Sequence, residues 1–183
     1  MWLMMAQVQS FQLSLLGGPR LDRGGRAIPI ERRKALALLA YLALTGECQR
    51  RETLAALFWP EADGPEGRAA LRRTLSVLNA ALEGGLDAQR DCVGLLPDQV
   101  ELDVARFRRQ IVAARQHHAP GAALCARCLA GLAEAVALYR GDFMDGFTLR
   151  DSPAFDDWQL QQTEALRREL AEGLELLATG YAT

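Results

Sequence analysis

The residues best suited to chemistry gather in one stretch, GRAALRRTLSVLNAAL, from Gly67 to Leu82. It holds three arginines and no carboxylate, which gives a local charge of +3. Arginine binds guanine edges or phosphate, asparagine binds adenine, and small residues allow a helix to approach a DNA groove closely. The stretch therefore predicts contact with DNA. The candidate contact residues within it are Arg68, Arg72, Arg73, Ser76 and Asn79.

An amphipathic helix would position these residues. Leucines at positions 71, 75, 78 and 82 fall on one helical stripe that must be buried, whereas Arg73 lies about 200° around the helix from the first of them. The alternative is a surface helix with a solvated charged face. Such helices usually pair Arg or Lys with Glu four residues away, and this stretch does not.

Two further helices are expected before this one, over Arg32 to Leu44 and Arg51 to Trp59, with a loop of sequence EADGPE at 61–66 between the second and third helices. The first helix opens with basic residues, although cations oppose the dipole at a helix N-terminus. Phosphate contact by Arg32, Arg33 and Lys34 would explain this placement, and a solvated helix start is the alternative. We expect Trp59 in the core.

Short strands surround the three helices. Residues 11–16 and 20–30 predict an N-terminal antiparallel sheet with a tight turn at Gly24-Gly25. Residues 93–96 and 100–104, separated by Pro97-Asp98-Gln99, predict a hairpin after the third helix, with Arg90 at its entry. This order is that of a winged helix-turn-helix, in which the third helix enters the major groove and the hairpin contacts the backbone or minor groove. Arg90 is the expected wing contact.

After residue 103 only helices are expected, over 104–116, 122–139 and 152–178. Small residues at helix crossings and aromatic anchors indicate paired antiparallel helices of tetratricopeptide-like character. The predicted fold class is thus mainly α with small β-sheets, divided into a winged helix-turn-helix at 1–103 and an all-α unit at 104–183. The aromatic anchors are Tyr139, Phe143, Phe155 and Trp158.

Several segments together resemble one family. Four segments are similar to bacterial activators of the antibiotic-regulatory-protein (SARP) type. They are RRKALALLAYLAL, ALFWPEAD, GRAALRRTLSVLNAAL and LYRGDFMDGFTLRDSPAFDDW. Members of that family join an OmpR-like winged helix to a helical bacterial transcriptional activation domain. The resemblance runs from about Phe11 to the C-terminus.

The resemblance implies binding to double-stranded promoter DNA, commonly as a pair of copies, and recruitment of RNA polymerase. It places Arg72, Arg73 and Ser76 on the recognition helix. Two departures from the family pattern stand out: the end of this helix carries fewer arginines, and the second unit has about three helices, which predicts a short member or a fragment of a longer regulator. The loop expected to face polymerase contains Glu61, Ala62 and Asp63.

Composition sets the limits of these interpretations. The 183 residues are 50% hydrophobic with a net charge of −2. There are 12 basic and 13 acidic residues up to residue 103, and 9 basic and 10 acidic residues beyond it. The near-neutral charge keeps open an alternative, a protein-interaction or dimerisation module with a degenerate winged helix. No apolar run is long enough for a membrane span, and the N-terminus lacks signal-peptide features, so we expect a cytoplasmic protein without a membrane partner.

The four cysteines are accordingly expected as reduced thiols. Cys125 and Cys128 form a C-x-x-C motif after His117 and His118, which invites a zinc or redox interpretation. Their helical spacing favours small buried hydrophobes instead, so no metal and no cofactor is predicted. No arrangement of nucleophile, base or phosphate loop is recognisable, and we expect no enzymatic activity.

Overall fold

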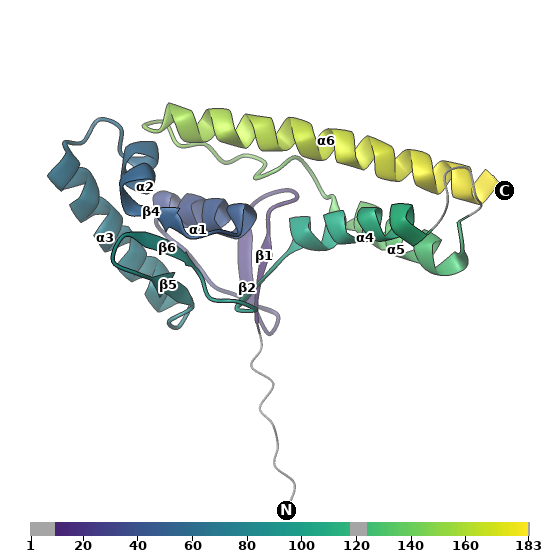
Figure 1. Ribbon diagram of the computed structural model, residues 1–183, viewed down its shortest axis with the longest axis horizontal. Coiled ribbons are helices and arrows are strands. Elements are labelled where there is room, and N and C mark those ends of the chain that lie inside the picture. The colour runs from purple at the N-terminus through teal and green to yellow at the C-terminus, as the bar shows by residue number, and fades with distance from the viewer. Residues whose placement is uncertain (1–9, 118–123, 183) are drawn as a thin grey trace, which may run out of the picture.

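The computed structural model describes residues 10–117 and 124–182 and shows an elongated molecule with helices at both ends (Figure 1). His118 and residues 122 and 123 of the predicted fifth helix lie outside the described residues. The first half contains β1 (Phe11–Ser14), β2 (Arg20–Arg23), β3 (Arg26–Ala27), α1 (Arg33–Thr45), β4 (Gln49–Arg50), α2 (Arg51–Phe58), α3 (Gly64–Ala81), β5 (Leu86–Ala88), β6 (Cys92–Leu95) and β7 (Val100–Leu102). It is followed by α4 (Asp103–His117), α5 (Ala126–Leu138) and α6 (Pro153–Ala182).

The N-terminal sheet has the order β3-β2-β1-β7. The turn at Gly24-Gly25 is confirmed, since both glycines take positive φ values of 56° and 78° that favour glycine. β1 pairs with β2 antiparallel and with β7 parallel. β7 was expected in the hairpin, and its place beside β1 is a correction.

The hairpin that follows α3 is formed by β5 and β6, not by residues 93–96 and 100–104 as predicted. β6 lies between β5 and β4 in a second sheet of three strands. The turn after β6 contains Asp98 with φ 59°, and it directs the chain to β1 instead of back onto β6. β5 escaped prediction because Leu86–Ala88 is too short to show an alternating pattern.

The helices of the first half match their predicted spans, except at the start of α3. α3 begins at Gly64 with Pro65 in its first turn, so residues 64–66 are helical and not loop. Its first turn therefore includes Glu66, and the absence of carboxylates holds only from Gly67 onward. The leucine stripe is confirmed as the buried face, since Leu71, Leu75 and Leu78 are buried against α1 and α2.

A disulfide joins Cys48 to Cys92, which corrects the expectation that all four cysteines are reduced thiols. The cause lies in the second sheet, where Arg50 of β4 stands opposite Cys92 of β6. This pairing brings the turn before β4 against the hairpin and holds the two Cα atoms 5.6 Å apart, a distance suited to a bridge. Cys125 and Cys128 are not part of a disulfide.

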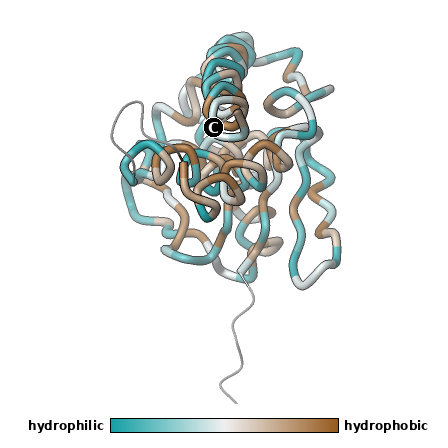
Figure 2. The backbone as a smooth tube through the Cα atoms, turned by 90° about the vertical axis from the view of Figure 1, so that its right-hand side faces the viewer, coloured by the Kyte–Doolittle hydropathy of each residue, from teal (hydrophilic) through white to brown (hydrophobic). Residues whose placement is uncertain are grey.

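The two halves share one continuous hydrophobic core. The segment between α5 and α6 returns to the first half, where the Met144 N–H donates to the Leu15 carbonyl over 2.8 Å. Phe155 at the start of α6 stacks on Phe58 at the end of α2, with ring centroids 5.3 Å apart. α6 begins beside α2 and extends over α4 and α5 (Figure 1). Hydrophobic and hydrophilic positions alternate along the helices in the backbone trace of Figure 2.

A buried carboxylate also connects the two halves through hydrogen bonds. Asp103, the first residue of α4, accepts hydrogen bonds from the backbone N–H groups of Leu15 and Leu16 over 2.9–3.0 Å. Burial raises the pKa of this carboxyl, while the backbone donors and Arg140 act in the opposite direction. None of the helices in the described residues combines the length and apolar character needed to cross a bilayer.

Candidate nucleic-acid interface

The outer face of α3 presents the predicted contact residues to solvent. Arg72, Arg73 and Ser76 are all exposed. Arg73 and Ser76 lie on the side opposite the buried leucines, and Arg72 lies on the flank of that side. Within the part of the chain that the structure describes, none of the three forms a side-chain hydrogen bond or ion pair. Their polar groups are available to an external partner that occupies this face.

Arg68 and Asn79 lie at the two ends of the same helix in different settings. Arg68 is exposed and its guanidinium folds back toward Gly64, beside the turn between α2 and α3. The Asn79 Oδ1 accepts a hydrogen bond from the Leu86 N–H over 3.3 Å and so fixes the start of β5. Asn79 therefore helps to position the hairpin, and its carbonyl oxygen is already engaged.

The hairpin of β5 and β6, the wing, is held at a fixed distance from α2. Arg51 donates from Nε to the Gln89 carbonyl and from its backbone N–H to the Asp91 carbonyl, each over 3.0 Å. These bonds and the Cys48–Cys92 disulfide surround the turn that carries Arg90. Arg90 is exposed at the tip of the wing, as a wing contact requires.

A basic cleft of about 760 Å³ opens beside α3, between the start of α1 and the loop before α6. Among the described residues that line it, five are basic and one, Asp151, is acidic. Three separate parts of the chain supply the basic side chains, so the cleft depends on contact between the two halves. The five are Arg32, Arg33, Lys34, Arg73 and Arg150.

Two of these five basic residues, Lys34 and Arg33, are engaged in contacts within the protein. Lys34, predicted as a phosphate contact, forms an ion pair with Asp151 at 2.8 Å and donates to the Phe58 carbonyl, with only 18% of its side chain exposed. This pairing lowers the pKa of the Asp151 carboxyl. Arg33 donates to the Thr148 carbonyl and lies over the Phe147 ring. Both residues join α1 to the loop before α6.

The other three basic residues, Arg32, Arg73 and Arg150, line the same cleft. Arg32 and Arg150 are exposed, and within the described residues neither forms a side-chain hydrogen bond or ion pair. With Arg73 they rim the cleft at the edge of the outer face of α3. Sequence reasoning missed Arg150, because only the return of residues 143–152 to the first half brings it near α3.

The turn expected to face polymerase joins α2 to α3. Glu61 and Asp63 are exposed and Ala62 is half-buried. The turn borders a second, shallow hollow of about 460 Å³ that also contacts Arg68. Trp59, expected in the core, is half-buried and lies between Phe58 and the Lys34 ammonium.

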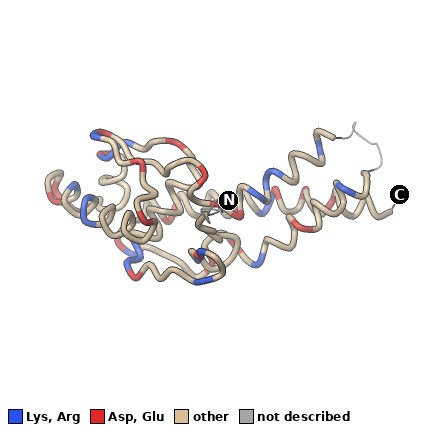
Figure 3. Tube along the Cα trace, turned by 90° about the horizontal axis from the view of Figure 1, so that it is seen from below, with Lys and Arg blue, Asp and Glu red and all other residues tan. Residues whose placement is uncertain are grey.

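Charges of both signs are interspersed along the whole trace (Figure 3), so the basic cleft is a local feature. No family model matches the sequence, and no curated protein matches it. A solved structure of Mycobacterium tuberculosis EmbR in complex with a low-affinity phosphopeptide has a similar fold, with a TM-score of 0.71 at 21% identity. The match covers 94% of this chain and 45% of the EmbR chain. The chain therefore has the fold of the matched part of that protein.

Proposed function

We propose that this chain is a sequence-specific regulator of transcription that binds double-stranded promoter DNA through α3, the wing and the rim of the basic cleft. The observation that carries the proposal is the exposed face of Arg72, Arg73 and Ser76 on a helix whose opposite face is buried. Such a helix can enter a major groove while the leucine stripe keeps it attached to the domain.

The proposed contacts divide into two classes. Arg72, Arg73 and Ser76 read base edges, since they lie on the outer face of the helix. Arg32 and Arg150 at the rim of the cleft, and Arg90 at the tip of the wing, contact phosphates and set the register of the protein on the duplex. Lys34 and Asn79 stay outside this set, because their polar groups are engaged within the protein.

The likeness to the EmbR fold agrees with a regulator, as does the family resemblance of the sequence. In this proposal the turn of Glu61, Ala62 and Asp63 faces RNA polymerase, and two copies of the chain bind adjacent sites. The proposed role is one of binding and recruitment in the cytoplasm, without catalysis.

The experiment is selection of binding sites from a double-stranded DNA library, followed by fluorescence anisotropy on the selected duplex at two salt concentrations. We expect Arg73→Ala to weaken specific binding by about 1–3 kcal/mol, or roughly 5- to 150-fold, and to relax the preference at one base pair. Arg150→Ala should weaken binding to all sequences alike and reduce the salt slope by about 1.

Arg109→Ala provides the matched control, because Arg109 is an exposed arginine of α4 in the other half of the molecule. It should leave affinity for the selected duplex unchanged. Failure of selection to enrich any sequence, or equal affinity of wild type and the Arg72→Ala/Arg73→Ala double variant, would refute the assignment of α3. Binding of a protein partner with little salt dependence would then support the interaction-module alternative.

A further inference from the structure

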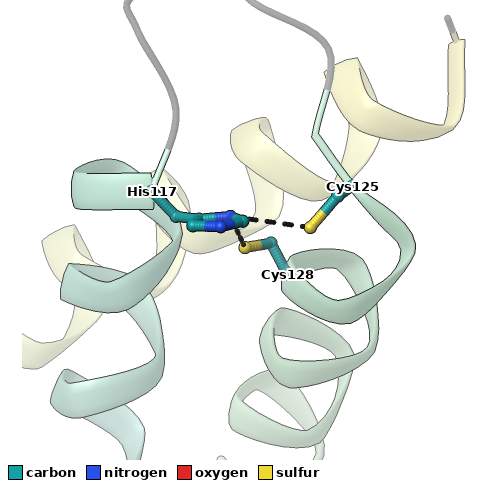
Figure 4. A group of neighbouring side chains, drawn as sticks. All are labelled: His117, Cys125 and Cys128. Carbon is teal, nitrogen blue, oxygen red and sulfur yellow. Dashed lines mark hydrogen bonds between the residues drawn. The ribbon is translucent and has the colours of Figure 1, made fainter.

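Three side chains of types that ligate metals, one histidine and two cysteines, lie together at the end of the molecule away from α3. His117 ends α4, Cys125 directly precedes α5 and Cys128 lies in the first turn of α5 (Figure 4). One ligand atom from each residue lies within 4.8 Å of the others. The helices that carry them pack closely against each other, so the convergence is fixed by the fold.

The distances match those of a metal site. The His117 Nδ1 lies 3.3 Å from the Cys128 Sγ and 3.6 Å from the Cys125 Sγ. Around a tetrahedral zinc ion, bond lengths of about 2.3 Å to sulfur and 2.1 Å to nitrogen place these atoms about 3.6 Å apart. Small rotations of the side chains would therefore bring all three into coordination.

The thiols are not fully buried in the core as the sequence predicts, although Cys128 packs against the edge of the core. Both cysteines are half-buried and His117 is exposed, so the cluster is open to solvent. α5 begins at Ala126, which leaves Cys125 at the N-cap on extended, non-helical backbone. A thiolate, not a thiol, is the form that binds metal.

We propose that His117, Cys125 and Cys128 form a zinc site that joins the end of α4 to the start of α5. Binding replaces the two thiol protons with one Zn²⁺, which is bound by two thiolates and the neutral imidazole, so two protons are released to solvent. Imidazole and thiolate ligands at tetrahedral spacing select zinc over magnesium or calcium, which prefer oxygen. The fourth position is open to water or to a ligand from a partner. The proposal is independent of DNA binding.

The test uses the full chain, freed of metal by a chelator under mild reducing conditions and then titrated with Co²⁺ and Zn²⁺. We expect one equivalent of Co²⁺ to give thiolate-to-cobalt charge-transfer absorption with the visible bands of tetrahedral cobalt, and Zn²⁺ to displace it. Cys128→Ser and His117→Ala should each weaken binding by more than about 100-fold, because loss of second-shell partners alone costs 10- to 100-fold.

The double variant Cys48→Ser/Cys92→Ser is the matched control, since it removes two cysteines and leaves the cluster intact. It should bind one equivalent of Co²⁺ with the wild-type spectrum. Circular dichroism of each variant without metal checks that it retains its helices. Octahedral cobalt bands without charge transfer, or unchanged affinity in Cys125→Ser/Cys128→Ser, would overturn the proposal.

Discussion

Single charged residues decide how basic the cleft beside α3 is. Asp151 is the one carboxylate among its described lining residues, and it is paired with Lys34. Replacement by asparagine removes a negative charge from beside the proposed phosphate contacts and breaks the ion pair with Lys34, which still donates to the Phe58 carbonyl. We therefore expect Asp151→Asn to raise affinity for DNA several-fold at low salt, with a smaller gain at high salt, as measured by anisotropy. An unchanged or weaker affinity would remove the cleft from the interface.

The same ion pair predicts a pH dependence of stability. The pKa of Asp151 in the folded protein lies below its ordinary value of 3.8. The ionised carboxylate therefore stabilises the fold at pH values above 3.8, and this stabilisation is lost as the pH falls through the lowered pKa. The Asp151 side chain is 65% exposed, which limits this contribution to about 1 kcal/mol or less. Urea denaturation of wild type and Asp151→Asn should differ at pH 7 and converge toward pH 2. A difference that stays constant with pH would contradict this assignment.

Among the elements, the wing depends most on bonds that are remote in sequence. The Cys48–Cys92 bridge closes a loop that contains α2 and α3. Loss of this cross-link in Cys48→Ser should lower the free energy of unfolding by about 2–4 kcal/mol under oxidising conditions. Denaturant titration of wild type with a thiol reductant should give the same loss, and the reductant should have little effect on the variant. Equal stability of wild type and variant without reductant would show that the bridge is not formed in solution.

Helices were more predictable from the sequence than strand pairing. The leucine period in residues 67–82 is strong enough to identify the buried and exposed faces of α3, and it predicted that Arg73 and Ser76 lie on the exposed face, where the structure has them. The sequence of residues 100–102 does not indicate which strand they pair with, because their partner β1 lies far away along the chain. The hairpin, the disulfide and the position of Arg150 all depend on such distant contacts.

The cluster at the start of α5 shows a related limit. A helix that began at residue 122 would place Cys125 and Cys128 within the first turns, where small buried thiols are common. The structure begins α5 at Ala126, and one residue of non-helical backbone at Cys125 turns its thiol toward His117. Helix boundaries are the least certain part of sequence-based prediction, and here the boundary determines the chemistry.

At the scale of the whole molecule, the aromatic joint between α2 and α6 makes the two halves interdependent. Phe155 is fully buried between Phe58, Phe147 and Trp158, with ring centroids 5.3–6.2 Å apart. The same joint holds the loop that carries Arg150 beside α3. A substitution in this joint should lower the local stability of both halves, whereas a substitution at the far end of α6 should lower only that of the second half.

Phe155→Ala and Leu177→Ala test this interdependence. Phe155→Ala should lower the free energy of unfolding by about 3–5 kcal/mol and Leu177→Ala by about 2–5 kcal/mol. The two variants therefore lose comparable stability at different places in the molecule. Hydrogen exchange read by mass spectrometry should then show faster exchange in α1, α2 and α6 for Phe155→Ala. For Leu177→Ala the increase should stay within the helices of the second half. If exchange in α1 and α2 is unaffected by Phe155→Ala, the halves fold independently, and the basic cleft between them cannot be a fixed part of the DNA-binding surface.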